Sequence, residues 1–179
     1  MKQKRKLIFV DFSEVLGGAQ TFLIDLMSNL SEDNKISIIK NQNSKVFNKK
    51  NLLKVKIYEI RSTTITFFSI WNIKKQLQSI KPILKNEQYI IVSNTNRSHL
   101  IILLYKIFFN RKLIVFFLLH DYLFPKKLVL IYKFIKNINY IPISSFIASH
   151  YGLKDNTIIQ NGFNFAYIKP RLPKSELSK

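Results

Sequence analysis

Short apolar runs alternate with helical stretches along almost the whole chain, and this alternation constrains the fold more than any other feature. The first run, Lys6–Phe12, is nearly continuous in apolar residues. The stretch Ala19–Leu30 follows, with its apolar residues spaced on one helical face. Strands that alternate with helices indicate βαβ units, and continuous apolar strands indicate a parallel sheet buried on both faces. The sequence therefore predicts a doubly wound, Rossmann-like α/β domain.

The other elements are predicted from the same two patterns. We expect strands at Ile36–Ile39, Val55–Ile60, Tyr89–Val92, Leu113–Leu119, Tyr140–Ser144 and Thr157–Ile159. We expect helices at Phe68–Ile80, Ser98–Phe109, Phe124–Ile138 and Ser145–Tyr151. Pro82 is expected just beyond its helix, Pro142 favours an edge strand, and Gly152 is expected as a helix C-cap. Residues 1–168 form the predicted domain, and the polar segment 169–179 is predicted to be a linker or tail.

The cysteine and histidine content excludes several kinds of site. The 179-residue chain has no cysteine, which excludes disulfides, thiolate zinc sites and cysteine nucleophiles. Its three histidines, His99, His120 and His150, have no carboxylate cluster beside them, so a protein-built metal site is not expected. His99 and His150 fall in predicted helices, and we assign them no role.

The net charge of +19 first suggests a nucleic acid or an anionic membrane as partner. The basic residues are 24 lysines and only five arginines, whereas bidentate phosphate and base contacts favour arginine. They are also spread evenly, with +10 over residues 1–98 and +9 over residues 99–179. The abundance of Ile, Asn and Lys also indicates a bias toward A/T-rich codons. Nucleic-acid binding is therefore kept only as a weak alternative.

No segment has the length and hydropathy of a membrane-spanning helix. The longest unbroken apolar run in the most apolar region, Leu113–Leu119, is far short of the ~20 residues needed. The basic start is followed by an apolar stretch, Leu7–Val10, that is too short for a signal peptide. We therefore expect a cytoplasmic protein.

The predicted helix Phe124–Ile138 offers a basis for peripheral attachment at the inner face of the membrane. One face is apolar, with Leu128, Ile131, Ile135 and Ile138, and charge is added by Lys126, Lys127, Lys133 and Lys136. Each lysine near an anionic surface contributes about 1 kcal/mol, so four give reversible attachment. The alternative, an ordinary helix packed on the sheet, is slightly favoured.

Candidate ligand-binding residues follow the predicted strands, because ligands bind at the carboxyl ends of the strands in such sheets. Gly17-Gly18 separates the first strand from the first helix, where backbone amides and the helix N-terminus favour an anion. A tight turn alone also favours glycine. The spacing matches neither a dinucleotide fingerprint nor a P-loop, which disfavours NAD binding and ATP hydrolysis.

Two further polar groups close predicted strands. His120-Asp121 ends an apolar strand, where a histidine binds a ligand hydroxyl or carries a proton; a plain surface histidine is the alternative. Within Ser93–Asn96, Asn94 and Thr95 are suited to recognise a hydroxyl or a phosphate. A helix N-cap explains that cluster equally well, and Ser144 has the same two interpretations.

These motifs, in this order, resemble the N-terminal domain of the retaining GT-B glycosyltransferases, the large group 1 or family 4 class. The resemblance covers about residues 6 to 165. Its motifs are Lys6–Phe12 followed by Leu16-Gly17-Gly18-Ala19-Gln20, then His120-Asp121, Ile143-Ser144 and Ile158-Ile159-Gln160-Asn161-Gly162-Phe163.

The resemblance implies a role for each matching residue. In that family the N-terminal domain mainly binds the acceptor, a glycan or a lipid-linked sugar, and the C-terminal domain holds most of the nucleotide-sugar donor. Gly17-Gly18 would approach the donor diphosphate and the acceptor, Gln20 would contact the acceptor, and His120 would lie near the transferred sugar as a catalytic residue. Asn161-Gly162 would begin the interdomain hinge. No metal and no cofactor besides the nucleotide sugar is implied.

The main departure from the family is the length, because the chain ends where a second, donor-binding domain begins in that family. The resemblance therefore implies that this chain alone does not transfer sugar with useful turnover. It would be an excised domain, a truncated product or one subunit of a split enzyme. The alternatives are a non-catalytic subunit that recruits a catalytic partner to a membrane, and a basic α/β domain that binds nucleic acid.

Overall fold

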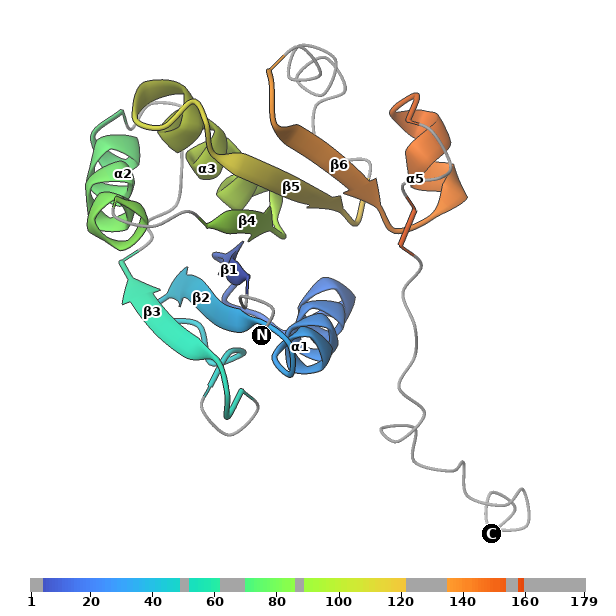
Figure 1. Ribbon diagram of the computed structural model, residues 1–179, viewed down its shortest axis with the longest axis horizontal. Helices are drawn as coiled ribbons and strands as arrows, with labels where there is room; N and C mark the ends of the chain where they lie inside the picture. The colour runs from blue at the N-terminus through green and yellow to red at the C-terminus, as the bar shows by residue number, and fades with distance from the viewer. Residues whose placement is uncertain are drawn as a thin grey trace, which may run out of the picture.

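Six parallel strands form one sheet in the computed structural model, in the order β3-β2-β1-β4-β5-β6 (Figure 1). Neighbouring strands are parallel at every pairing. The strands are β1 (Lys6–Asp11), β2 (Lys35–Asn41), β3 (Lys56–Ile60), β4 (Ile90–Ser93), β5 (Ile114–Leu119) and β6 (Ile138–Pro142). The predicted doubly wound, Rossmann-like fold is confirmed.

The structure describes residues 5–48, 52–61, 70–85, 89–121, 135–153 and 158–159. Within them the helices are α1 (Gly18–Leu30), α2 (Ile70–Leu84), α3 (Asn96–Phe108) and α5 (Ser145–His150). The expected strand over Thr157–Ile159 is not seen at Ile158 and Ile159, although the Ile159 amide donates to the Pro142 carbonyl at 3.1 Å.

Each face of the sheet has its own apolar core. Side chains alternate along β1, so Ile8 and Val10 join the cluster with α2 and α3, whereas Leu7 and Phe9 join the cluster with α1. Figure 1 shows α1 on one side of the sheet and α2 and α3 on the other. Burial of β1 on both faces explains why its sequence is nearly all apolar.

The ends of the elements correct two sequence predictions. Pro82 lies inside the last turn of α2 rather than beyond it, because the helix continues far enough to bury Leu84 one turn after Ile80. The helix predicted over Phe124–Ile138 does not include residues 135–138, since Asn137 has a left-handed φ of 64° and Ile138 begins β6; its residues 124–134 lie outside the described part of the chain. By contrast, β6 is an edge strand as Pro142 indicated, and Gly152 follows α5 with a φ of 60°.

Within the described part of the chain, no helix is both long enough and apolar enough to cross a membrane.

Candidate functional site

The carboxyl ends of β1, β4 and β5 bring together polar residues that are far apart in the sequence. β1 lies where the strand order reverses, with β2 on one side and β4 on the other. Its last residue is Asp11, and Asn94 follows β4 directly, with its amide donating to the Val10 carbonyl at 3.1 Å. His120 follows β5. This edge is where doubly wound sheets bind their ligands.

Asp11 is the centre of a buried hydrogen-bond network. Its side chain is fully buried, and its Oδ2 accepts hydrogen bonds from Asn94 Nδ2 at 2.6 Å and Gln20 Nε2 at 3.2 Å. Its Oδ1 accepts a third from the Ser13 backbone amide at 2.7 Å. Gln20 Nε2 also donates to Ser13 Oγ at 2.9 Å. Asp11 therefore joins β1, the β1–α1 loop, α1 and the end of β4.

The orientation of Asn94 determines which nitrogen of His120 carries the proton. A carboxylate only accepts, so the Asn94 atom that faces Asp11 must be the NH₂ group, and Oδ1 must face His120. His120 Nε2 lies 2.7 Å from this oxygen and therefore donates to it. Nδ1 of neutral His120 is then an acceptor. It is buried and has no hydrogen-bond partner among the described residues.

Burial also keeps His120 neutral at physiological pH. Desolvation lowers the pKa of His120 below its usual 6.5, and the charges of Asp11 and Asp121 only partly oppose this effect. The ring of Phe22 in α1 lies edge-on to the imidazole, with 5.7 Å between the ring centroids. At pH 7 the imidazole of His120 is therefore uncharged, and the lone pair of its buried Nδ1 is a hydrogen-bond acceptor.

The glycine turn lies exposed beside this network. Gly17 is the N-cap of α1 and Gly18 its first residue, and no side chain caps the helix there. A Cβ atom on Gly17 would come within 3.1 Å of Gln20 Oε1, whereas a Cβ on Gly18 would meet nothing within 4 Å. The fold itself therefore tolerates a side chain at Gly18. The free amide groups of this turn are a favourable place for an anion.

Two charged residues that the sequence analysis does not single out, Glu14 and Arg97, lie in the same region. Glu14, in the β1–α1 loop, accepts a hydrogen bond from Asn41 Nδ2 at 2.5 Å. Burial lowers the pKa of Arg97 at the start of α3, and the negative charge of Glu14 opposes that shift. Asp11 was also missed, although a carboxylate that ends an apolar strand is a visible signal.

The capping interpretation is confirmed for two predicted site residues. Thr95 is the N-cap of α3, where its Oγ1 accepts from the Ser98 amide and the Ser98 hydroxyl accepts from the Thr95 amide. Ser144 is the N-cap of α5 and accepts from the Ile147 amide at 3.2 Å. Both hydroxyls thus stabilise helix starts, and their predicted contact with an acceptor is not tested by this geometry.

Some predicted residues lie outside the described part of the chain. These are the hinge residues Asn161 and Gly162 and three of the lysines of the predicted membrane surface, Lys126, Lys127 and Lys133. The fourth lysine, Lys136, is exposed in the turn before β6. No described group of three His, Cys, Asp or Glu side chains is placed to hold a metal ion.

His99, to which we assigned no role, is a buried structural residue. Its ring nitrogens lie 2.9 Å from Ser93 Oγ and 3.1 Å from the Leu118 carbonyl oxygen, and its ring packs on Phe117. Burial lowers the pKa of His99 to about 3, which the Leu118 hydrogen bond only partly opposes. His99 therefore joins α3 to β4 and β5 as a neutral side chain.

The buried histidine predicts how stability depends on pH. Unfolded His99 binds a proton near pH 6.5 and folded His99 only near pH 3, so stability present above pH 6.5 is lost as the pH falls. From pH 7 to pH 5 the free energy of unfolding should fall by about 2 kcal/mol, and His120 adds to the loss. Urea unfolding at both pH values measures this. His99→Gln should reduce the pH dependence, and an unchanged dependence would contradict the assignment.

The fold matches solved glycosyltransferase structures at low sequence identity. HepE of Anabaena, in complex with UDP and glucose, matches with a TM-score of 0.61 and 18% identity over 93% of this chain and 47% of that chain. A glycosyltransferase of Rickettsia africae matches with a TM-score of 0.73 and 19% identity over 98% and 48%. The lipopolysaccharide outer core galactosyltransferase WaaB, without ligand, matches with a TM-score of 0.57 and 16% identity over 86% and 44%.

This chain spans about half the length of each of these structures. At such identities the likeness shows a shared fold alone. No protein-family model and no curated protein sequence matches the chain.

Proposed function

We propose that this chain is the acceptor-binding half of a GT-B glycosyltransferase that takes its sugar from a nucleotide-sugar donor. The observation that carries the proposal is the Asp11–Gln20–Asn94–His120 network, which lies beside an open glycine turn at the ligand-binding edge of the sheet. The fold is that of glycosyltransferases, and HepE was solved with UDP-glucose.

Each residue has a defined part in this proposal. The exposed turn at Gly17 and Gly18 lets the donor diphosphate and the acceptor approach the backbone amides of α1. Gln20 uses its NH₂ group on Asp11 and Ser13, which leaves Oε1 as the atom that accepts from an acceptor hydroxyl. His120 Nδ1, which is buried in this structure, would accept a hydrogen bond from the transferred sugar when the sugar binds. In this proposal the sugar is transferred with retention of its anomeric configuration and without a metal, and the acceptor is a glycan or a lipid-linked sugar.

The second half of the donor site belongs to another domain or subunit in this proposal. Since this chain covers about half of each matched structure, we expect it to bind acceptor without turning over donor efficiently. NMR titration with soluble glycans and with short-chain lipid-linked sugars tests the binding. The backbone amides of Gly18, Gln20 and Asn94 should shift, whereas those of Ser79 on α2 and Lys85 just after it should not.

Two outcomes would contradict this proposal. If no acceptor of either kind moves these amides, the edge of the sheet is not an acceptor site. If the chain alone transfers radiolabelled sugar from a nucleotide sugar at an ordinary enzymatic rate, the division between two halves is wrong.

A further inference from the structure

A basic pocket lies at the opposite edge of the sheet, where β1, β2 and β3 begin. Its volume is about 450 Å³, which falls within the range of about 300–1,000 Å³ typical of small-ligand sites. It is lined by Lys6, Asn34, Lys35, Ile36, Ser37, Lys54, Lys56, Tyr58 and Tyr89. Four of these nine residues are lysines and none is acidic.

The strand register explains how these side chains meet. Lys6 of β1 is the direct neighbour of Lys35 in β2, and Ser37 of β2 is the neighbour of Lys56 in β3. Side chains two residues apart share a face, so Lys6 lies on the same face of β1 as Ile8. That face carries the core packed against α2 and α3. Positive charges therefore cluster on this face where the strands begin, whereas the rest of the face is apolar.

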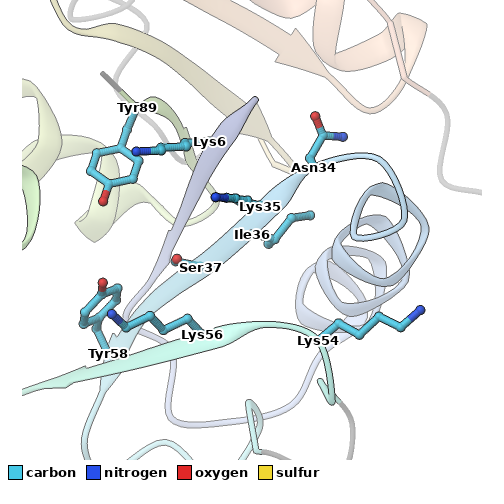
Figure 2. A pocket seen from close by; sticks show the side chains of 9 residues that line it. All are labelled: Lys6, Asn34, Lys35, Ile36, Ser37, Lys54, Lys56, Tyr58 and Tyr89. Atoms are coloured by element: carbon cyan, nitrogen blue, oxygen red, sulfur yellow. The ribbon is translucent and has the colours of Figure 1, made fainter. Parts of the chain in front are cut away.

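The aromatic residues border the same charges. Tyr58 and Tyr89 are half-buried and pack against the core under α2 and α3, which fixes their rings. The Lys56 ammonium lies 4.8 Å from the centroid of the Tyr58 ring. Figure 2 shows the ammonium groups of Lys6, Lys35 and Lys56 on the side of the two tyrosine rings, whereas Lys54 extends the other way.

The pocket brings positive charges together on neighbouring strands. Like charges directly opposite each other on neighbouring strands destabilise a sheet, and Lys6 and Lys35 form such a pair. An anion bound between these ammonium groups would relieve their repulsion, and tyrosine and serine hydroxyls can donate to its oxygens.

We propose that the basic pocket binds a phosphate group, carried either by a soluble phosphorylated compound or by the headgroup of an anionic lipid. The site is separate from the proposed acceptor site, because a six-residue strand such as β1 puts about 17 Å between its two ends. The proposal therefore does not depend on sugar transfer.

Binding of two probes to substituted chains tests the proposal. Inorganic diphosphate is titrated by calorimetry, and flotation is measured with phosphatidylglycerol vesicles and with neutral phosphatidylcholine vesicles. K35Q/K56Q should weaken binding of the effective anionic probe at least ten-fold. The matched control K45Q/K85Q removes two exposed lysines outside the pocket and should change binding less than two-fold.

The charge-conserving variant K35R/K56R should stay within about three-fold of the native chain. Binding of diphosphate assigns the pocket to soluble phosphates, and binding of phosphatidylglycerol vesicles alone assigns it to lipid headgroups; both support the proposal. Amide shifts at Ser37 and Lys56 on adding diphosphate or phosphatidylglycerol provide a readout on the native chain. Equal losses in K35Q/K56Q and K45Q/K85Q, or binding of neither probe, would overturn the proposal.

Discussion

Replacing Asp11 with alanine is expected to lower the free energy of unfolding by about 3–5 kcal/mol. The substitution removes the carboxylate that accepts hydrogen bonds from Asn94, Gln20 and the Ser13 amide. Each hydrogen bond to a charged group contributes about 1.5–3 kcal/mol, and the substitution leaves the buried NH₂ group of Asn94 without the carboxylate that accepts from it. Gln20 keeps its bond to Ser13, which limits the sum. Urea unfolding followed by circular dichroism measures the change.

The matched control is Asp33→Ala in the loop after α1. Asp33 is exposed, so its substitution should change the free energy of unfolding by no more than about 0.5 kcal/mol. If Asp11→Ala costs less than 1 kcal/mol, the network does not stabilise the carboxyl edge of the sheet, and the site described above is not preorganised.

Asp11 shows which part of the site can be predicted from the local sequence and which part depends on how the strands pair. The sequence alone places Asp11 at the end of an apolar run and Asn94 in a polar cluster after another run. Their contact spans 83 residues and depends on β4 pairing with β1 on the side away from β2. Hydrophobic periodicity predicts each strand but does not specify their order in the sheet.

His99 and His120 show a similar limit. His120 could be placed at the ligand-binding edge because its strand ends one residue before it. His99 falls in α3, and helical spacing alone does not tell that it reaches across to the Leu118 carbonyl of β5. The burial and the hydrogen-bond partners of a helical residue depend on how the helix packs against other elements. For His99 they depend on the packing of α3 against β4 and β5.

Some helix ends can also be predicted from nearby residues, whereas others depend on contacts with distant parts of the chain. Thr95 and Ser144 are N-caps that their residue type already indicated, because the cap satisfies amides within three residues. The element boundaries near Pro82 and Asn137 depend on a longer-range contact and on an unusual backbone conformation, respectively. Leu84 is buried in the core and keeps α2 helical past the proline, and the left-handed Asn137 turns the chain into β6.

His120→Gln is expected to reduce the rate of sugar transfer about 100-fold or more while leaving the fold intact. The glutamine NH₂ group takes the place of Nε2 and keeps the hydrogen bond to Asn94 Oδ1. No atom of glutamine replaces Nδ1, so the proposed acceptor of a sugar hydroxyl is lost. Losing one preorganised hydrogen bond to the transition state has an effect of about this size. The rate is measured with nucleotide sugar and acceptor, with the donor-binding half supplied.

His120→Asn provides the complementary test, because its amide lies near the position of Nδ1 and does not reach Asn94. We expect it to retain more transfer activity than His120→Gln but to be less stable to urea, since Asn94 Oδ1 then loses its donor. His150→Gln on α5, away from the carboxyl ends of β1 and β4, should leave the rate unchanged. Native activity in His120→Gln would show that Nδ1 contacts no reacting sugar, and the role of His120 would then be confined to holding Asn94.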